Sequence, residues 1–405
     1  MNSFLSRRAM IGAGTAFFTT PLLRAIRLDD SSSAGTLIVL QLSGGNDGLS
    51  TIIPWADPAY QQARRATRRS GTEVLTLDHY RGFHPALKNL HQIYGQGKMA
   101  VIEGCGYPNQ IRSHFKAFDI WHTASSQGRG AGNGWIGNLA GELQGNHHAS
   151  EFVVHVGANE PYSLHSNSHP ACSVRSPTAY RWFGSDGGPA DLVGTAGEGM
   201  SKPADPRHKG RDAALAQLRG VLADAQSSSL RVRAAAAIHQ PVVDFPRTAI
   251  GAQLRDVSAI VQGGLGTRIA SSVVGGFDTH AGQRVKHDRL MEELDGALGA
   301  LFTDLGGSPA GRNTTVLVFS EFGRRVKENG SGGTDHGKAG PMFVLGHGVK
   351  GGLLGKHPSL SELDNGDLAY TTDFRSVYAS LIKQCLGVDP KRVLGAAYPS
   401  LRLLG

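Results

Sequence analysis

The sequence predicts an α/β protein with a mostly parallel sheet flanked by helices. Short apolar runs of β type alternate with longer amphipathic stretches along the 405 residues, which is the pattern of strands that cross over to helices. The chain is 40% hydrophobic and 18% charged, as expected for a globular protein. Its 55 glycines show no fixed period and therefore indicate turns rather than a fibrous repeat.

The strand candidates are apolar runs bounded by turn residues: Thr36–Leu42, Lys98–Glu103, Glu151–Val156, Arg268–Val274, Thr314–Phe319 and Pro341–Leu345. The helix candidates lie between them: Pro85–Tyr94, His114–Ala124, Ala213–Ala225, Ile250–Val261, Val285–Leu305 and Asp373–Leu386. Because strands and helices alternate, we expect the strands to run parallel. Residues 161–247 contain fewer strand signals and are predicted to be either a cap over the site or an ordinary insertion.

The charge pattern argues against nucleic acid as a partner. The net charge of +8 comes from 41 basic and 33 acidic residues, and most of the basic residues are dispersed. Arg64, Arg65, Arg68 and Arg69 form the one dense run, but no aromatic residues are interleaved with it. We interpret this run as a solvated helix face. No phosphate-binding loop, Rossmann fingerprint or internal repeat is present.

The chain has three cysteines without a CxxC pair, so at most one disulfide and no zinc ribbon are expected. Cys105 and Cys385 lie in apolar runs and are predicted to be buried thiols without a catalytic role.

Residues 1–34 resemble a targeting segment. Arg7 and Arg8 form a twin-arginine pattern, and the weakly apolar run Ile11–Leu23 follows. The alternative is a chance arginine pair before a buried helix. The apolar run is too short for a permanent membrane span, and no other candidate span exists. We therefore expect export by the Tat pathway to the periplasm or the medium, with residues 35–405 forming the folded domain.

Acids and histidines follow several of the predicted strands. Asp47 comes after the first strand, Asp278 and His280 follow a later one, and Glu321 follows Thr314–Phe319. Loops at the carboxyl ends of parallel strands open into one crevice, so we expect these side chains to meet. Asp335 and His336 add an adjacent carboxylate and imidazole. Such mixed ligands suit zinc or manganese, whereas each acid alone would more often be a cap or turn residue.

Five motifs carry a resemblance to the bacterial domain-of-unknown-function 1501 family: Leu40-Gln41-Leu42-Ser43-Gly44-Gly45-Asn46-Asp47-Gly48, Arg112-Ser113-His114-Phe115, Phe277-Asp278-Thr279-His280, Ser320-Glu321-Phe322-Gly323-Arg324 and Gly333-Thr334-Asp335-His336-Gly337. The resemblance extends over nearly the whole chain. That family is similar in turn to the alkaline phosphatase and sulfatase superfamily, which implies a three-layer sandwich with divalent metals at the carboxyl edge of the sheet.

The resemblance also implies roles for individual residues. It makes Ser113 the nucleophile at the start of a helix, although a serine there is equally a standard N-cap. It implies metal ligands at Asp47, Asp278, His280, Glu321, Asp335 and His336. His287 is the alternative to His280, because the superfamily usually has a longer spacing after the aspartate. Arg324 or Arg325 would clamp a tetrahedral anion.

These residues together predict an exported metal-dependent hydrolase of phosphate or sulfate esters that uses a serine nucleophile. The metal would be zinc, with manganese, magnesium or calcium as alternatives, and the substrate a small-molecule or glycan ester. The alternative is a non-catalytic envelope protein that keeps the fold for binding or assembly. Phe322 favours this alternative, because the superfamily has a metal-binding histidine at that position.

Overall fold

The computed structural model describes residues 35–145, 149–180 and 209–405. All the described residues belong to one compact unit. The predicted targeting segment, residues 1–34, therefore lies outside the described residues. Within the described residues, no helix has the length and apolar character to cross a membrane.

A central sheet of nine strands organises the described residues. The strands are β1 Thr36–Leu42, β5 Met99–Gly106, β6 Val153–Val156, β7 Cys172–Val174, β8 Ile269–Val274, β9 Thr314–Phe319, β10 Gly340–Leu345, β11 Gly352–Leu354 and β14 Thr372–Asp373. Their order is β11-β5-β10-β9-β1-β8-β6-β7, and β14 also pairs with β5. All pairs are parallel except those of β10, which runs antiparallel to both β9 and β5. The predicted mostly parallel sheet is confirmed.

Strand β1 lies at the centre of this sheet, and this position accounts for its apolar sequence. Leu37 pairs with Ile269 of β8 on one side and with Thr315 of β9 on the other. All of β1 after Thr36 is buried. A strand covered on both faces needs apolar side chains on both, which is why this run does not alternate between apolar and polar residues.

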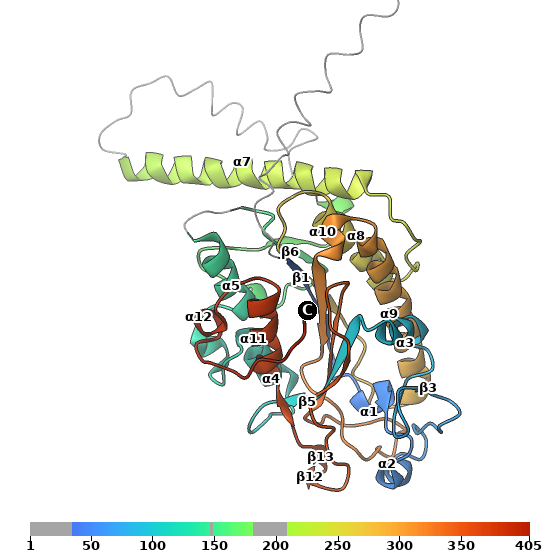
Figure 1. The fold of residues 1–405 in the computed structure, drawn as a ribbon. Helices are drawn as coiled ribbons and strands as arrows, with labels where there is room; N and C mark the ends of the chain where they lie inside the picture. Colours follow the sequence, from blue (N-terminus) through green and yellow to red (C-terminus); the bar gives the residue numbers. More distant parts are fainter. Residues whose placement is uncertain (1–34, 146–148, 181–208) are drawn as a thin grey trace, which may run out of the picture. The chain divides into compact units, whose positions relative to one another are not determined.

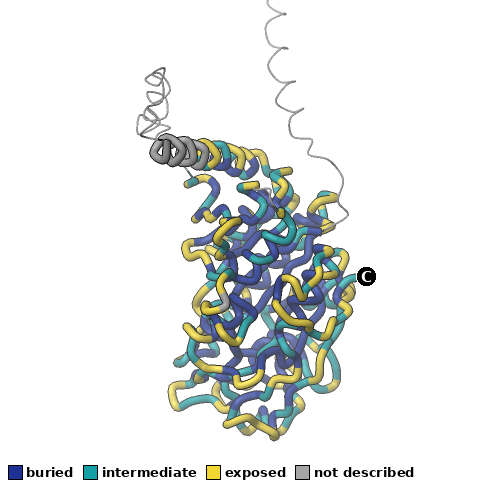
Figure 2. The backbone as a smooth tube through the Cα atoms, turned by 90° about the vertical axis from the view of Figure 1, so that its left-hand side faces the viewer, coloured by how far each residue is buried: buried dark blue, intermediate teal, exposed yellow. Residues whose placement is uncertain are grey.

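Helices cover both faces of the sheet, so the predicted three-layer arrangement is confirmed (Figure 1). One layer consists of α4 His114–Thr123, α5 Trp135–Gln144, α11 Phe374–Gln384 and α12 Pro390–Leu394. The other consists of α3 Lys88–Gly95, α8 Ala249–Gln262 and α9 Gln283–Gly306. Figure 2 shows the buried backbone running through the middle of the molecule, with exposed loops around it.

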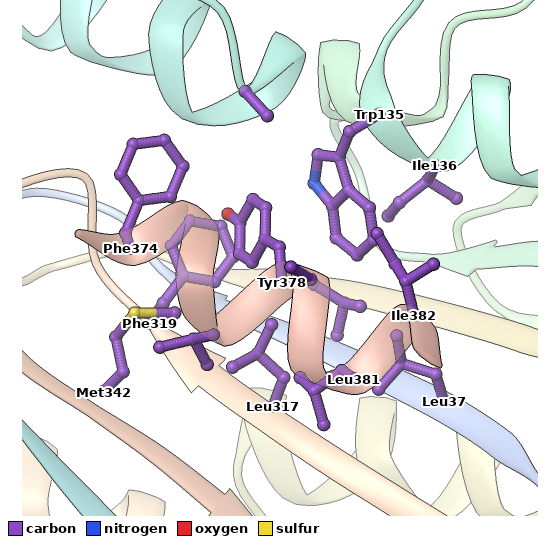
Figure 3. Close-up of a cluster of buried hydrophobic side chains, with 14 of the residues drawn as sticks. Leu37, Trp135, Ile136, Leu317, Phe319, Met342, Phe374, Tyr378, Leu381 and Ile382 are labelled. Carbon is purple, nitrogen blue, oxygen red and sulfur yellow. The ribbon is translucent and has the colours of Figure 1, made fainter. Parts of the chain in front are cut away.

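The core between the sheet and α11 is rich in aromatic side chains (Figure 3). The ring of Tyr378 stacks on Trp135 at 4.5 Å between centroids, and Phe374 stacks on Trp121 at 4.1 Å. Helix α11 begins at Phe374 because the carboxylate of Asp373 accepts a hydrogen bond from the amide of Arg375. This core fixes α11, and through Trp121 it also fixes α4, which carries part of the candidate site.

The described residues also contain one long helix, α7 Lys209–Ile238, and several short elements: α1 Gly48–Thr51, β2 Ile52–Ile53, α2 Pro58–Ala63, β3 Leu75–Thr76, β4 Gly82–Phe83, α10 Pro309–Arg312, β12 Leu363–Asp364 and β13 Asp367–Leu368. Strands β2, β3 and β4 form a small sheet, and β12 and β13 form a hairpin.

The described part of residues 161–247 adds one strand to the sheet and contains the long helix α7. β7 extends the edge of the sheet beside β6, and Arg231 of α7 pairs with Glu151 just before β6 at 2.7 Å. Residues 181–208 of this region lie outside the described residues, so the predicted cap stays a prediction.

The arginine run differs from the expected solvated helix face. Arg64 is fully buried and Arg69 is 8% exposed, and they pair with Asp47 and Asp288 respectively. Arg65 and Arg68 are exposed as expected. The sequence could not show this, because both acids that neutralise the buried arginines come from other parts of the chain. The three cysteines are free and buried.

Candidate metal centre and active site

The loops at the carboxyl edge of the sheet meet, as the parallel topology requires. The edge collects the segments after β1, β5, β8 and β9. Because β10 is antiparallel to β9, residues 320–339 leave the sheet and return to it at this same edge. The amide of Gly323 donates to the carbonyl of Lys338, and Arg324 forms a β-bridge with His336. His336 is thereby held beside the end of β9.

Three ligand-type atoms converge at this edge. Nε2 of His280 lies 3.0 Å from Nε2 of His336. Oδ1 of Asp278 lies 3.0 Å from the first of these nitrogens and 3.2 Å from the second. The side chain of Asp278 is 47% exposed, so solvent and solutes can reach this group. The structure therefore brings together three of the six predicted ligands.

Hydrogen-bond partners behind the two rings orient them. Nδ1 of His336 lies 2.9 Å from the carbonyl oxygen of Arg112, and Nδ1 of His280 lies 3.2 Å from Oδ1 of Asp335. Both oxygens only accept, so a neutral ring that keeps its proton on Nδ1 presents a lone pair at Nε2. In that tautomer the two lone pairs and the Asp278 carboxylate face one another, and a bound cation would offset their repulsion. An oxygen acceptor behind the ring is the usual support of a metal-binding histidine.

A third imidazole, from His114 at the start of α4, belongs to the same cluster. His114, Asp278 and His336 offer ligand atoms that all lie within 4.8 Å of one another. Nδ1 of His114 lies 2.7 Å from Oε1 of Glu321, and this hydrogen bond raises the pKa of His114 above its ordinary value. His114 was not among the ligands predicted from the sequence, although it stands in the motif that singled out its neighbour Ser113.

Glu321, predicted to be a metal ligand, instead supports this histidine. Its side chain is fully buried, and Oε1 accepts from His114 and from the amide of Gly44 at 2.9 Å. Oε2 accepts from the hydroxyl of Ser320 at 3.1 Å. Both oxygens are therefore engaged within the protein. Asp335 supports His280 in the same way, which makes both acids positioning residues.

Asp278 remains anionic at neutral pH. Burial alone would raise its pKa, but the hydrogen bond and charge of Arg324 outweigh burial and hold the pKa below its ordinary value. A carboxylate and neutral imidazoles are ligands that zinc accepts, so the residues present fit that ion. Asp278, His280 and His336 would hold it, with His114 adjacent.

Arg324 does not clamp an anion, contrary to the prediction. Its side chain has no exposed area. Its guanidinium donates to the carbonyls of Gly44, Gly45, Phe277 and Thr334 and to Oδ1 of Asp278. These bonds tie the loops after β1 and β8 to the loop before β10. A planar group with five donors suits this task.

Asp47 is not brought into the cluster. Its carboxylate accepts hydrogen bonds of 2.6 and 3.0 Å from Arg64, and Ser50 and Gln283 also donate to it. Burial alone would raise the pKa of Asp47, but the charge and hydrogen bond of Arg64 outweigh burial and lower it well below the ordinary range. The predicted metal-ligand role of Asp47 is thus corrected to that of a buried ion-pair partner.

His287, the alternative to His280, also lies outside the cluster. It is 2% exposed, and its Nε2 is 3.2 Å from Oδ1 of Asn46. Burial lowers its pKa to about 3, so the ring is neutral.

Ser113 immediately precedes α4, and its two neighbours in the chain, Arg112 and His114, both contact residues of the site. The carbonyl of Arg112 accepts from His336, and the imidazole of His114 contacts Glu321. Ser113 occupies the N-cap position, yet its side chain makes no capping hydrogen bond. The capping role that a serine at this position would ordinarily have is therefore not used.

Phe322 fills the position where the superfamily resemblance implies a metal-binding histidine. Its ring is 4.8 Å from the ring of His114 and 4.9 Å from that of His336, and it is 2% exposed. Gly45 leaves room for it, because a Cβ there would lie 2.4 Å from the Phe322 ring. An apolar ring thus closes one side of the cluster.

Comparisons with known proteins agree with part of the sequence interpretation. Residues 254–397 match the family model described as protein of unknown function, DUF1501. The resemblance to this family is confirmed for these residues, which include Asp278 and His336 but not Ser113. We expected the resemblance to this family to cover nearly the whole chain, but the family model matches residues 254–397. None of the curated proteins matches the chain.

Several solved structures show a weak likeness. Ps i-CgsB is 10% identical, with a TM-score of 0.38 over 90% of this chain and 75% of that one. A 2-O GAG sulfatase is 9% identical, with a TM-score of 0.32 over 78% of this chain and 65% of that one. A sulfatase-like protein from Bacteroides thetaiotaomicron is 9% identical, with a TM-score of 0.36 over 92% and 73%. At these TM-scores the likeness carries no argument about the activity.

Proposed function

We propose that the protein is an exported, metal-dependent hydrolase of phosphate or sulfate esters. The observation that carries this proposal is the approach of Nε2 of His280, Nε2 of His336 and Oδ1 of Asp278 to within 3.2 Å of one another. Oxygen acceptors behind both rings support the tautomer with the proton on Nδ1, in which both Nε2 atoms can bind a cation. Zinc is the ion that this ligand set suits best.

Ser113 is the proposed nucleophile. Its Oγ attacks the phosphorus or sulfur atom, the bond to the ester oxygen breaks, and the alcohol leaves with a proton; water then cleaves the seryl ester and releases phosphate or sulfate. The amino terminus of the ten-residue helix α4 favours the negative charge of the transferred group. A bound divalent ion would polarise the ester oxygen and lower the pKa of the attacking hydroxyl. Arg324 and Glu321 hold the loops and rings in place.

The test combines metal analysis with turnover. The full-length protein, purified without chelator, is analysed for zinc, manganese, magnesium and calcium, and assayed with aryl phosphates, aryl phosphodiesters and aryl sulfates. We expect about one divalent ion per chain and turnover of one ester class. Ser113→Ala should abolish turnover and keep the metal, whereas His336→Ala should lose both. Ser126→Ala, an exposed serine beyond the other end of α4, is the matched control.

The second candidate is a non-catalytic envelope protein that binds a metal or an anion. Phe322 favours it, because this ring replaces an expected ligand and faces His114 and His336. Stoichiometric metal without turnover on any ester would establish this candidate. Turnover that survives Ser113→Ala would instead remove the nucleophile from the proposal.

The proposed export rests on Arg7 and Arg8. Replacing both with lysine in the full-length chain should retain the protein in the cytoplasm of the producing bacterium. Unchanged periplasmic or extracellular protein would contradict Tat export.

A further inference from the structure

A groove of about 1000 Å³ lies beside the cluster formed by Asp278, His280 and His336. It is formed by α2 and the residues after it, by residues 325–330 and by the hairpin β12–β13. The polar and charged side chains that matter here are Arg65, Arg325, Lys327, Glu328, Asn329 and Asp335. Asp335 links groove and cluster, because it lines the groove and accepts from Nδ1 of His280. An ester bound at the cluster can therefore extend into the groove.

The two acids of the groove, Glu328 and Asp335, accept hydrogen bonds from other residues of the chain. Glu328 accepts from the amides of Ala66 and Thr67 at 2.9 and 3.0 Å. Asp335 accepts from Asn329 at 3.0 Å and from His280. These hydrogen bonds hold both carboxylates in place and use part of their accepting capacity.

The positively charged side chains of the groove have fewer partners within the protein than its two acids. Arg65 and Lys327 are exposed, and their side chains form no ion pair or hydrogen bond with any described residue. Arg325 is held at the wall by Asp367, with Nε 3.4 Å from Oδ1, and by the carbonyl of Asn365. The groove therefore offers two exposed cationic side chains, Arg65 and Lys327, that have no partner among the described residues.

The remaining wall is apolar and shallow. Ala59, Ala63, Val326, Leu360 and Leu363 line it. Cationic side chains around small aliphatic ones suit a ligand with carbon-rich faces and several anionic groups, and the groove is too large for a lone aryl ester.

We propose that this groove binds a second anionic group on the carrier of the ester, so that the substrate is a polyanionic ester and not a simple monoester. The identity of the reacting group rests on the proposed function, but anion binding in the groove can be measured without it. Arg65 and Lys327 contact the second anionic group, and Arg325 lines the same groove.

The binding test uses short dextran sulfate as the probe, with uncharged dextran for comparison and tripolyphosphate to distinguish a sulfated from a phosphorylated ligand. The full-length double variant Arg65→Gln/Lys327→Gln is compared with Arg68→Gln/Arg289→Gln. The control also removes two exposed positive charges, but neither residue lines the groove. We expect about tenfold weaker binding in the groove variant and less than about twofold in the control.

Equal weakening in the two double variants would overturn the proposal, because it would show attraction by the net charge alone. Unchanged binding in the groove variant would overturn it as well. Stronger binding of tripolyphosphate than of dextran sulfate would assign the ligand to the phosphorylated class.

Kinetics separate the groove from the reacting site. For an aryl ester with a second anionic group, the groove variant should raise KM about tenfold and leave kcat unchanged, while KM for a monoanionic aryl ester stays the same. In Ser113→Ala, dextran sulfate binding should persist. If Ser113→Ala kept full turnover while the groove variant still lost binding, the serine mechanism would fail and the groove would stand.

Discussion

Arg64 and Asp47 face each other through two hydrogen bonds of 2.6 and 3.0 Å, with both side chains fully shielded from solvent. The pair joins the loop after β1 to the residues after α2, and Arg64 also donates to the carbonyl of Val326 at 2.6 Å. It therefore connects the loop after β1, at the carboxyl edge of the sheet, with Val326 in the wall of the groove.

Replacing Arg64 with methionine should destabilise the protein by about 3–5 kcal/mol, because the carboxylate of Asp47 is then buried without a partner. Urea denaturation at pH 7 measures this. The double variant Arg64→Met/Asp47→Asn should recover part of the loss, since the unpaired charge is gone. A single variant within about 1 kcal/mol of the parent would show that the pair is not buried in solution.

Arg324→Lys should lower stability by several kcal/mol, because lysine cannot donate to four carbonyls and a carboxylate at once. If Arg324 clamped substrate instead, the same change would raise KM and leave the urea midpoint intact. Arg284→Lys is the control, because this arginine pairs with Glu73 at the surface. Measuring the urea midpoint together with KM distinguishes the two roles.

Gly333→Ala should weaken metal binding about 10- to 100-fold by displacing His280. A Cβ at Gly333 would lie 2.2 Å from the carbonyl carbon of His280, so the backbone of that ligand has to shift. Gly330→Ala is the matched control in the same loop, because a Cβ there meets nothing within 4 Å. Competition with a zinc-binding dye measures both. Equal affinities would mean that His280 is not a ligand.

His122 should make the protein less stable in mild acid. Burial, followed by the charge of Arg129, lowers the pKa of this histidine to about 3. The unfolded chain therefore binds a proton as the pH falls below about 6.5, while the folded protein does not until about 3. Stability is then lost between these values at about 1.4 kcal/mol per pH unit for one proton.

Replacing His122 with glutamine should reduce that pH dependence by about one proton. Its Nε2 lies 2.8 Å from Oε1 of Gln41, and a glutamine amide keeps a donor there. Urea denaturation at pH 7 and pH 5 gives the slope. An unchanged slope would show that His122 is already exposed to protonation in the folded state.

The sequence predicted those features that depend on local pattern and topology. The bounds of β1 and β9 match the predicted runs, because buried parallel strands are continuous apolar stretches with abrupt polar ends. Asp278 and His280 follow β8, so parallel strand direction places them at the carboxyl edge, whereas His336 reaches this edge because β10 is antiparallel to β9. None of these predictions required knowledge of a particular side-chain contact.

Other features depended on contacts between distant segments. Arg64 was predicted to lie on a solvated helix face and Arg324 to clamp an anion. Both are buried instead, with partners that come from other parts of the chain. The role of Glu321 depended on the imidazole of His114, which is 207 residues away. Spacing in the sequence carries no signal for such pairings.

Because β10 runs antiparallel to β9, the ends of residues 320–339 are held in place independently of the length of the turn between them. Their two ends are clamped side by side, at Gly323 and Lys338, by the same hairpin that continues β9 and β10. Lengthening or shortening the turn around Gly330 would therefore reshape the wall facing a bound ligand while the pairing of the strands stays in register. The length of this turn can therefore change at little cost in folding free energy.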